Sequence, residues 1–515
     1  MLAGRAAAVS RAASSRSLAW EIVRSTRRSS RRYNRSRTSV ADLFADLYSY
    51  ALALGCALTV AVSFVIGLRI EIADRGPAGR GVISPEWLVL PGPVLWTLLT
   101  YAALAGITTL ARRLGPISVR GPEGGWWLPL PVDRRPMVLP AFLRRCVLTC
   151  AGAVAAFLPF SFLTSLERIA PQHLLASATF GAVSVLAVAL AALQQLEIIN
   201  PRFTRSASAV VLLPCAVLPS LPWSPWPLIL AALSAIVLIS VIAPRAGQVR
   251  GAELIRGGAV AGHASASIFF LDTNEMFRVF RGNRHAVETG RAARFYARPA
   301  RGPVRALFRA DIVAFVRLHP SMAAPVFCLG ACISVLLVDA GLPAPLQLAV
   351  ITLAGCATAS SLGTVPRRTT LVPELDALLP VAPTLVRASR TLMPALAMAL
   401  WMACLSGILV MLGPVGPALI LMGALSGVAM GAGAVRSATR PAPDWSVLPV
   451  ETPFGPVPQA QFSSLLRGLD VTILALGPLL LALYLGAVNP YLIILQAIVS
   501  TGVVAVVVLR PFSTR

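Results

Sequence analysis

Long apolar stretches alternate with short polar or proline-rich breaks along almost the whole chain. The first two uninterrupted apolar segments are Leu47–Leu68 and Trp87–Ala111, and a second pair follows at Cys146–Leu166 and Ile169–Leu196. A helix that crosses the hydrocarbon core of a bilayer needs about 20 predominantly apolar residues. These four segments are therefore predicted to be membrane spans, the third of them beginning a little earlier, near Ala141.

Proline-rich turns divide the remaining apolar stretches. A charge-free run over 206–244 is broken by "LPSLPWSPWP" into two segments. The later segments are Ser321–Ala340, Ala344–Val365, Thr391–Val435 with a break at "GPVGP", and Val471–Leu509 with a break at "GAVNP". Proline and glycine clusters of this kind are typical of tight turns between helices. The pattern predicts an all-α polytopic integral membrane protein with about twelve transmembrane helices, arranged as two six-helix halves.

A basic segment separates the two halves. Residues 245–320 contain 13 arginines and five acids, and their last part, "VRALFRADIVAFVRLHP", carries its apolar residues along one helical face. This is typical of an interfacial helix just before a span, and "VADLFADLY" (40–48) is a looser counterpart before the first span. The predicted domains are an Arg-rich N-terminal segment with an elbow-like helix (1–46), a first half (47–244), a linker ending in an amphipathic elbow helix (245–320) and a second half (321–515).

Composition supports a lipid environment and excludes one class of enzyme. The chain is 56% hydrophobic and 13% charged, with a mean hydropathy of +0.75, more apolar surface than a soluble fold can bury. All 45 basic residues are arginine, a bias typical of a GC-rich genome such as that of an actinobacterium. A phosphate-binding P-loop requires lysine, so we expect no ATPase site of this kind and no nucleotide-binding site of its own in this chain. The eight cysteines lie in apolar runs and the four histidines are scattered, so neither a disulfide framework nor a metal site is expected.

The distribution of arginine predicts the orientation in the membrane. If the N-terminus is cytoplasmic, only Arg69, Arg75, Arg80 and Arg168 lie outside, and the other 41 arginines lie inside. Positive residues favour the cytoplasmic side, so we expect a multi-pass plasma-membrane protein with both termini cytoplasmic. The first 46 residues hold ten arginines and three acids. We interpret them as an anchor on anionic lipid, with a mitochondrial transit peptide or a nucleic-acid-binding segment as alternatives.

The two halves share a pattern in their inside loops. The link between the second and third spans is long in both, over 112–140 and 366–390, and each link contains an acid, a hydrophobic stretch, Leu-Pro-Val and then arginines. The two tripeptides lie at 130–132 and 379–381, and a third, at 448–450, follows Asp444-Trp445 in another inside loop. One such tripeptide means little in a chain of this composition. Two at matching places indicate duplication of a six-span unit.

This arrangement resembles a known family of transport proteins. An elbow-like amphipathic helix, two spans, the segment "EGGWWLPLPVDRRPMVLP" (123–140) and four more spans resemble the ABC-2 type of ABC-transporter permease. Two such units in one chain are similar to the fused twelve-span permeases of actinobacterial antibiotic exporters. The second copy departs from the pattern, since it reads "LPVAPTLVRASR" where the first reads "LPVDRRPM".

The resemblance implies a partner and a set of contact residues. The link between spans two and three would be a coupling helix that docks on a separate nucleotide-binding ATPase subunit, present in two copies, with ATP and Mg²⁺ bound by that subunit. Tryptophan would anchor such a contact and charged groups would fix its register; the alternative is that these side chains are interfacial-belt and topogenic residues only. The implied residues are Glu123, Trp126, Trp127, Asp133, Arg134 and Arg135 in the first half, and Glu374, Asp376, Arg387 and Arg390 in the second.

The composition of the spans bears on the cargo. Charged residues are nearly absent from the span interiors, where Gln194, Gln195 and Gln496 are the main polar groups. Ion channels and proton-driven carriers need titratable or coordinating groups along their path, so a hydrophobic or amphipathic cargo (antibiotic, peptide or lipid-like) is expected, moved by an exporter. A secondary transporter of the major-facilitator kind and a membrane enzyme remain alternatives. Small residues at a four-residue spacing predict helix packing, and they are Gly423, Gly427 and Gly431.

Overall fold

The computed structural model describes most of the chain in two compact units. The described residues are 2–37, 39–74, 90–164, 168–196, 201–221, 223–269, 302–318, 322–337, 344–370, 374–413, 415–440, 450–452, 455–457 and 468–509. The first unit comprises Met1–Asp74 and Gly92–Ala266, and the second comprises Arg75–Pro91 and Ser267–Arg515. Within the predicted linker, 270–301 lie outside the described residues, as do most of the third Leu-Pro-Val and the Asp444-Trp445 before it.

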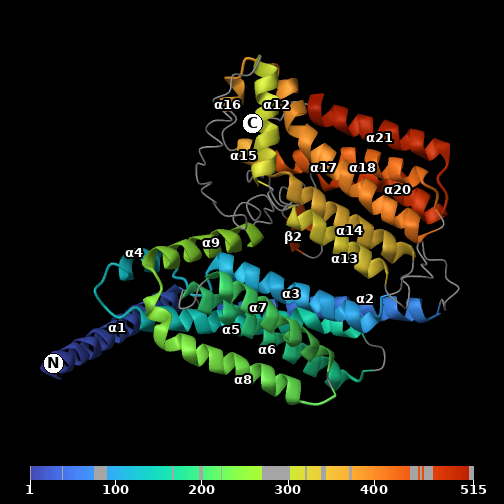
Figure 1. The fold of residues 1–515 in the computed structure, drawn as a ribbon. Coiled ribbons are helices and arrows are strands. Elements are labelled where there is room, and N and C mark those ends of the chain that lie inside the picture. Colours follow the sequence, from blue (N-terminus) through green and yellow to red (C-terminus); the bar gives the residue numbers. More distant parts are fainter. Residues whose placement is uncertain are drawn as a thin grey trace. The chain divides into compact units, whose positions relative to one another are not determined.

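The described secondary-structure elements of the first unit are all helices (Figure 1). Its elements are α1 (Leu2–Arg37), α2 (Val40–Asp74), α3 (Gly92–Leu114), α4 (Gly121–Trp127), α5 (Arg135–Thr164), α6 (Ala170–Gln195), α7 (Pro201–Val217), η1 (Leu218–Ser220), α8 (Trp226–Ile242), η2 (Ala243–Gln248) and α9 (Gly251–Phe269). The predicted interfacial stretch 40–48 is not a separate helix, because it forms the first turns of α2.

The second unit adds one small β-hairpin to a second set of helices. Its elements are α12 (Pro303–Leu318), α13 (Ala323–Leu336), α14 (Ala344–Leu362), α15 (Thr364–Thr369), α16 (Glu374–Ala377), α17 (Pro383–Leu412), α18 (Ala418–Ala438), β1 (Val450–Thr452), β2 (Gly455–Val457), α20 (Leu469–Leu485) and α21 (Pro490–Leu509). The two strands are antiparallel and pair Val450 with Val457. The amphipathic stretch predicted just before the second half forms α12.

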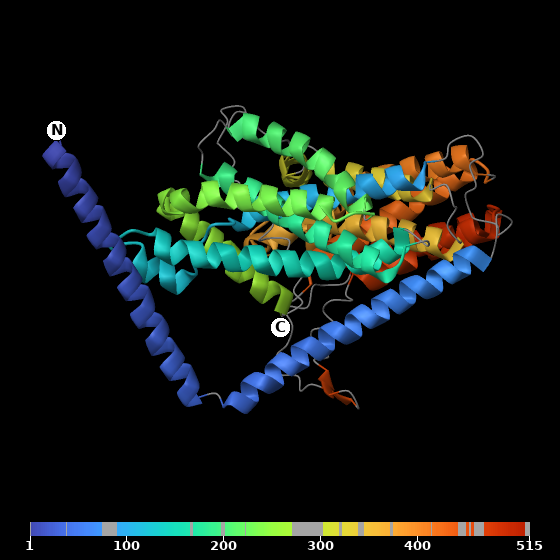
Figure 2. The ribbon, with the colours of Figure 1, turned by 90° about the horizontal axis from the view of Figure 1, so that it is seen from below.

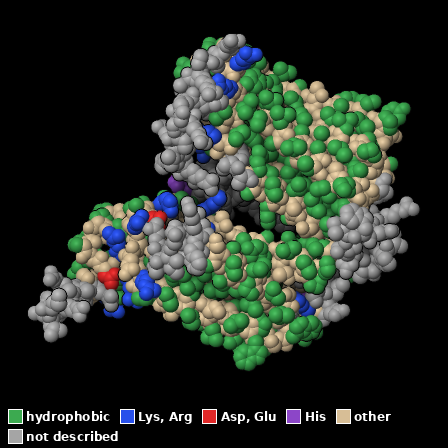
Figure 3. Space-filling view, viewed as in Figure 1, with side chains coloured by type: hydrophobic (Ala, Val, Ile, Leu, Met, Phe, Trp, Pro, Cys, Tyr) green, Lys and Arg blue, Asp and Glu red, His purple; other side chains and the backbone are tan. Residues whose placement is uncertain are grey.

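Nine helices in the described part of the chain are long and apolar enough to cross a membrane. They correspond to nine of the twelve predicted spans; the other three predicted spans coincide with the shorter helices α7, α13 and α20. α12 and α13 would pass the same test together, but they are bent by 62°. Green hydrophobic side chains cover much of the visible surface of the helices (Figure 3), as expected for helices that face lipid. The chain is thus a polytopic, almost wholly helical membrane protein.

Each unit is built around its fourth predicted span. In the first unit, α6 packs against α3, α5, α7 and α8; in the second, α18 packs against α14, α17, α20 and α21. Two further contacts correspond, since α2 lies against α5 as α13 lies against α17, and α3 lies against α7 as α14 lies against α20. Among the described residues, the contacts of α13 with α14 and of α20 with α21 are extensive in the second unit only. α6 and α18 are also the most buried of the candidate spans. The packing around the central helix is therefore similar in the two units, whereas contacts among the other helices differ.

Small residues allow the central helix of the second unit to approach its neighbour closely. A Cβ added at Gly427 of α18 would lie 2.6 Å from Ala399 Cα of α17, and one added at Gly431 would lie 2.6 Å from Ala395 N. A Cβ at Gly423 would meet Met402 O at 2.9 Å. Real Cβ atoms do not tolerate such distances, so these three glycines set the separation of α17 and α18.

Candidate functional site: two loop segments between the second and third spans

The two Leu-Pro-Val tripeptides form the same hydrogen-bonded turn. In the first unit, Leu130 N donates to Trp127 O at 3.1 Å and Val132 N donates to Leu130 O at 2.8 Å. In the second, Leu379 N donates to Asp376 O at 3.2 Å and Val381 N donates to Leu379 O at 2.8 Å. A bond between residues two apart closes a γ-turn around the proline, whose fixed φ suits that turn.

Both turns occupy the same place in the chain. Each follows a short helix, α4 or α16, and each leads into a 30-residue helix, α5 or α17, that includes the third predicted span. We name these parts the first segment (residues 120–135) and the second segment (residues 374–390). The long helices begin earlier than predicted, at Arg135 and Pro383, because arginine and an N-terminal proline are compatible with a helix that extends beyond the apolar stretch.

The predicted contact residues of the first segment divide into outward and inward groups. Trp126 is 79% exposed, and Leu130, four residues later, is also exposed. Trp127 is half-buried and packs against the buried cluster that contains Val119, Leu128 and Val138. Trp126 is therefore accessible to a partner, whereas Trp127 packs α4 against its own unit.

The charged residues of the first segment bond to nearby backbone. Asp133 Oδ1 accepts a hydrogen bond from Arg135 N at 3.0 Å, where α5 begins, and Glu123 Oε2 accepts one from Arg120 N at 3.4 Å, where α4 begins. Arg134 Nη2 donates to Leu128 O at 3.4 Å. Carboxylates near a helix start satisfy amides that have no partner within the helix. These groups shape the segment itself, and Arg135, half-buried, is the first residue of α5.

Residues outside the prediction hold the loop that precedes α4. Gln195 of α6 clamps Ile117, since Gln195 Nε2 donates to Ile117 O at 2.8 Å and Gln195 Oε1 accepts from Ile117 N at 3.1 Å. Arg145 Nη1 of α5 donates to Gly115 O at 3.1 Å and Pro116 O at 3.0 Å. The sequence signal for Arg145 was an arginine pair inside an apolar run. Together these contacts tie the loop rigidly to two spans.

Helix α9 supports the first segment from another side. Val119 N donates to Leu254 O at 3.2 Å. A Cβ added at Gly258 would lie 2.7 Å from the carbonyl carbon of Val119, and one added at Gly124 of α4 would lie 3.4 Å from Ile255 Cγ1. The start of the predicted linker is therefore part of the structure that carries α4.

The second segment is held by charge instead of by tryptophan packing. Arg390 of α17 is 8% exposed, and its Nη1 and Nη2 donate to the two carboxylate oxygens of Asp376 in α16. The preceding residue also bonds to another helix, since Ser389 Oγ donates to Asp311 Oδ2 of α12 at 2.6 Å. The contacts join the elbow helix, the short helix and the long helix, and Asp311 was not among the predicted residues.

The other predicted residues of the second segment lie differently. Arg387 is buried and its Nε donates to Pro383 O of the same helix at 3.2 Å, whereas Glu374 is exposed at the start of α16. Leu378, which the sequence reasoning missed, is 78% exposed, and Leu379 next to it is also exposed. Each segment thus presents apolar side chains to the surroundings at its turn, Trp126 with Leu130 and Leu378 with Leu379.

These features define a class: a polytopic helical membrane protein with two similar units, each carrying a turn-bearing segment between its second and third predicted spans. Residues 92–447 match the model of DUF6297, a family of unknown function. The match covers more than half of the chain, so the protein belongs to this family, and both segments lie inside the matched range. Comparison with curated proteins and with solved structures found no match.

Proposed function

We propose that this chain is the membrane-spanning permease subunit of an ABC-type exporter. Twelve spans in two six-helix halves would move a hydrophobic or amphipathic substrate by alternating access. A separate nucleotide-binding subunit, in two copies, would bind ATP and Mg²⁺ and hydrolyse the ATP, so that this chain would itself be no enzyme. The chain would lie in the plasma membrane with both termini cytoplasmic, as the arginine distribution favours.

The observation that carries the proposal is the repeated Leu-Pro-Val turn. In both units the turn lies between a short helix and the helix of the third predicted span, with Val N bonded to Leu O at 2.8 Å. A subunit that drives transport from outside the membrane must push on a stiff element that is continuous with a span. A turn locked by proline and joined directly to a 30-residue helix meets that requirement.

The exposed apolar side chains support a protein contact at both turns. Trp126 and Leu378 are each more than three-quarters exposed, and tryptophan is enriched among the anchor residues of protein interfaces. The side chains that fix each segment, Trp127 in one and the Asp376–Arg390 ion pair in the other, point into their own unit. The residues available to contact a partner are thus different from the residues that hold each segment in place.

The two segments differ in how they are built, and the proposal extends to this difference. Packing and backbone hydrogen bonds hold the first segment, whereas an ion pair between the buried Arg390 and the partly exposed Asp376 holds the second. An ion pair is weakened by salt and by competing charges. We expect the two ATPase contacts to be unequal, the second being the one more sensitive to ionic strength.

Co-purification tests the proposal directly. The chain is affinity-purified from its native membrane in mild detergent, and the expected result is an ATPase subunit at a ratio of two per chain. The double variant Trp126→Ala with Leu378→Ala should lose that subunit while the membrane protein is recovered in normal amount. A matched control replaces exposed apolar residues elsewhere, Trp223→Ala with Leu400→Ala, and should keep it. Recovery of the chain without any ATPase, together with transport that follows a proton gradient, would favour a secondary transporter instead.

A further inference from the structure

The C-terminal part of α1 is an arginine-rich helix whose described side chains are exposed. Every described side chain from Arg24 to Arg37 is exposed, whereas Ala19 and Val23, just before it, are buried in the core of the first unit. Residues 24–37 therefore form an arm that α1 projects from its docking point. We name these 14 residues the arginine arm.

Six of the arginines in the arm lie on one side of the helix. They follow one another at spacings of three and four, which place residues on one helical face, and they are Arg24, Arg27, Arg28, Arg31, Arg32 and Arg35. The seventh, Arg37, lies over the ring of Tyr33 at 5.0 Å, away from this face. Glu21 is the one acid in α1, so the face carries a strong positive charge.

In an isolated helix of this composition the arginine side chains repel one another. Like charges three and four residues apart destabilise a helix, and a polar helix without tertiary packing is marginal in water. The arm has several such arginine pairs, no acid and no buried side chain. An anionic surface that neutralises the six arginines would remove the repulsion and stabilise the helix.

The connection to α2 indicates which anionic surface lies within reach. α1 ends at Arg37 and α2 begins at Val40, and the apolar stretch of α2 begins at Leu47. The seven α2 residues 40–46, which precede the apolar stretch, rise about 10 Å. The end of the arm is therefore held close to the head groups of the bilayer. Figure 2 shows α1 and α2 meeting in a bend, which lets α1 run across the direction of the span.

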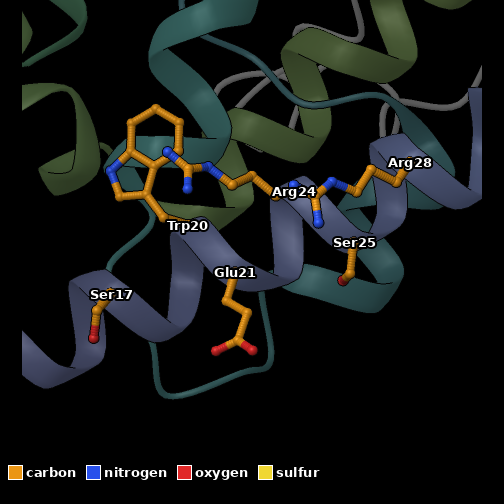
Figure 4. Close-up of a pocket in the computed structure, with 6 residues that line it drawn as sticks. All are labelled: Ser17, Trp20, Glu21, Arg24, Ser25 and Arg28. Carbon is orange, nitrogen blue, oxygen red and sulfur yellow. The ribbon is translucent and has the colours of Figure 1, made fainter.

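The face also offers groups that suit a phosphate ester. Figure 4 shows an open hollow beside α1 lined by Trp20, Arg24 and Arg28 on one edge, and by Ser17, Glu21 and Ser25 on the next. Arginine and serine hydroxyl groups bind phosphate oxygens, and tryptophan favours the interface between lipid and water. Glu21 reduces the charge of the hollow without reversing it.

We infer that the arginine arm binds the head groups of anionic phospholipids in the leaflet that adjoins α2. The arm would become a stable helix only on such a leaflet, each arginine strengthening the attachment roughly fivefold. Because Ala19 and Val23 pack into the same buried cluster as Leu128 of the first segment, lipid binding would also hold α1 against the structure that carries α4. This inference does not depend on the proposed ATPase partner.

Amide hydrogen exchange of the full-length protein in nanodiscs tests the inference. One set of discs contains phosphatidylcholine alone, and the other contains roughly 30% phosphatidylglycerol, enough to give a strongly negative surface. The amides of 24–37 should exchange at least tenfold more slowly in the anionic discs, and high salt should abolish the difference. Equal exchange in the two kinds of disc would overturn the inference.

A rearranged variant distinguishes the effect of the arginine face from the effect of net charge alone. Residues 28–31 read Arg-Ser-Ser-Arg, so the changes Arg28→Ser, Ser29→Arg, Ser30→Arg and Arg31→Ser keep the composition and move two charges off the face. We expect this variant to lose most of the protection in anionic discs while the amides of α6 keep theirs. Unchanged protection would refute the role of the face. Protection by added RNA in neutral discs, with none from phosphatidylglycerol, would show a nucleic-acid-binding arm and would also overturn the inference.

Discussion

Arg390 and Asp376 form a two-pronged ion pair that joins the short helix α16 to the long helix α17. The arginine is almost wholly buried, while about a third of the aspartate side chain remains exposed. A buried guanidinium group without a counter-ion is costly. The ion pair is therefore the main polar restraint that we find on the position of α16 among the described residues.

Replacing Asp376 with alanine should destabilise the second unit. The change leaves the Arg390 charge buried without its partner, and because Asp376 is partly exposed we expect a loss of about 1–3 kcal/mol, less than for a fully buried pair. Thermal unfolding in detergent would measure it. The double variant with Arg390→Met should recover part of the lost stability, since it leaves no buried charge without a counter-ion. Glu374→Ala, on the same short helix but exposed, serves as the control and should leave the melting temperature unchanged.

The prolines of the two turns should control the stiffness of the segments. Replacing Pro131 or Pro380 with alanine frees φ at the centre of the γ-turn. The amides of Val132 and Val381, which now bond to Leu130 and Leu379 at 2.8 Å, should then exchange with solvent several-fold faster, each in its own variant. Hydrogen exchange with peptide resolution is the measurement.

Pro129, immediately before the first turn, offers a matched control for Pro131. It lies outside the γ-turn, within the preceding ring that Leu130 N closes on Trp127 O, so Pro129→Ala should leave the exchange of the Val132 amide close to that of the unchanged protein. Faster exchange in the control as well would show that any proline in the loop protects the Val132 amide. The γ-turn would then not be the specific cause of the stiffness.

Sequence pattern predicted the helices well because the relevant signal is local. A run of about 20 apolar residues is long enough to span lipid wherever it occurs, and each of the twelve predicted spans coincides with a helix, nine of them long enough to cross. The starts of α5 and α17 were placed too late, since arginines such as Arg387 were assigned to a loop. Helices continue through such residues when other helices pack against them.

The contacts that fix the two segments could not be predicted, because they join residues distant in sequence. Gln195 clamps Ile117 and Asp311 accepts a bond from Ser389, and neither pair shares a motif or a spacing. Trp126 and Trp127 are adjacent and identical, yet one is exposed and the other packs into the unit. The position of the Leu-Pro-Val tripeptides was visible in the sequence, whereas their common hydrogen bonding was not.

A polar cluster among α18, α20 and α21 should contribute jointly to the stability of the second unit. The carbonyl oxygen of Ala475 accepts hydrogen bonds from Ser426 Oγ at 3.0 Å and from Gln496 Nε2 at 2.9 Å. Ala475 lies inside α20, three residues before Pro478, whose missing N–H affects the carbonyl oxygen of Leu474. In a lipid-embedded bundle the alternative to these bonds is a hydroxyl and an amide side chain without partners.

Removal of either donor should cost little, and removal of both should cost about the sum of the two losses. Ala475 O keeps its helical donor in each variant, so we expect about 0.5–1 kcal/mol for Ser426→Ala and for Gln496→Leu. The double variant should therefore cost about 1–2 kcal/mol. A double-mutant cycle on the free energy of unfolding measures the coupling. A loss well above the sum would mean that Ala475 O depends on the two side chains for its hydrogen bonding.

The close approach of α17 and α18 should make Gly427 intolerant of even one methyl group. Its added Cβ would lie 2.6 Å from Ala399 Cα, a backbone atom that cannot turn aside, so the helices must separate. We expect Gly427→Ala to cost about 1–3 kcal/mol, as overpacking does in cores, and to lower the melting temperature in detergent. Gly477, in α20, has no atom within 4 Å of an added Cβ, and alanine there should be neutral or stabilising because it favours the helix. If both changes proved neutral, the glycine contact would not determine the spacing of α17 and α18.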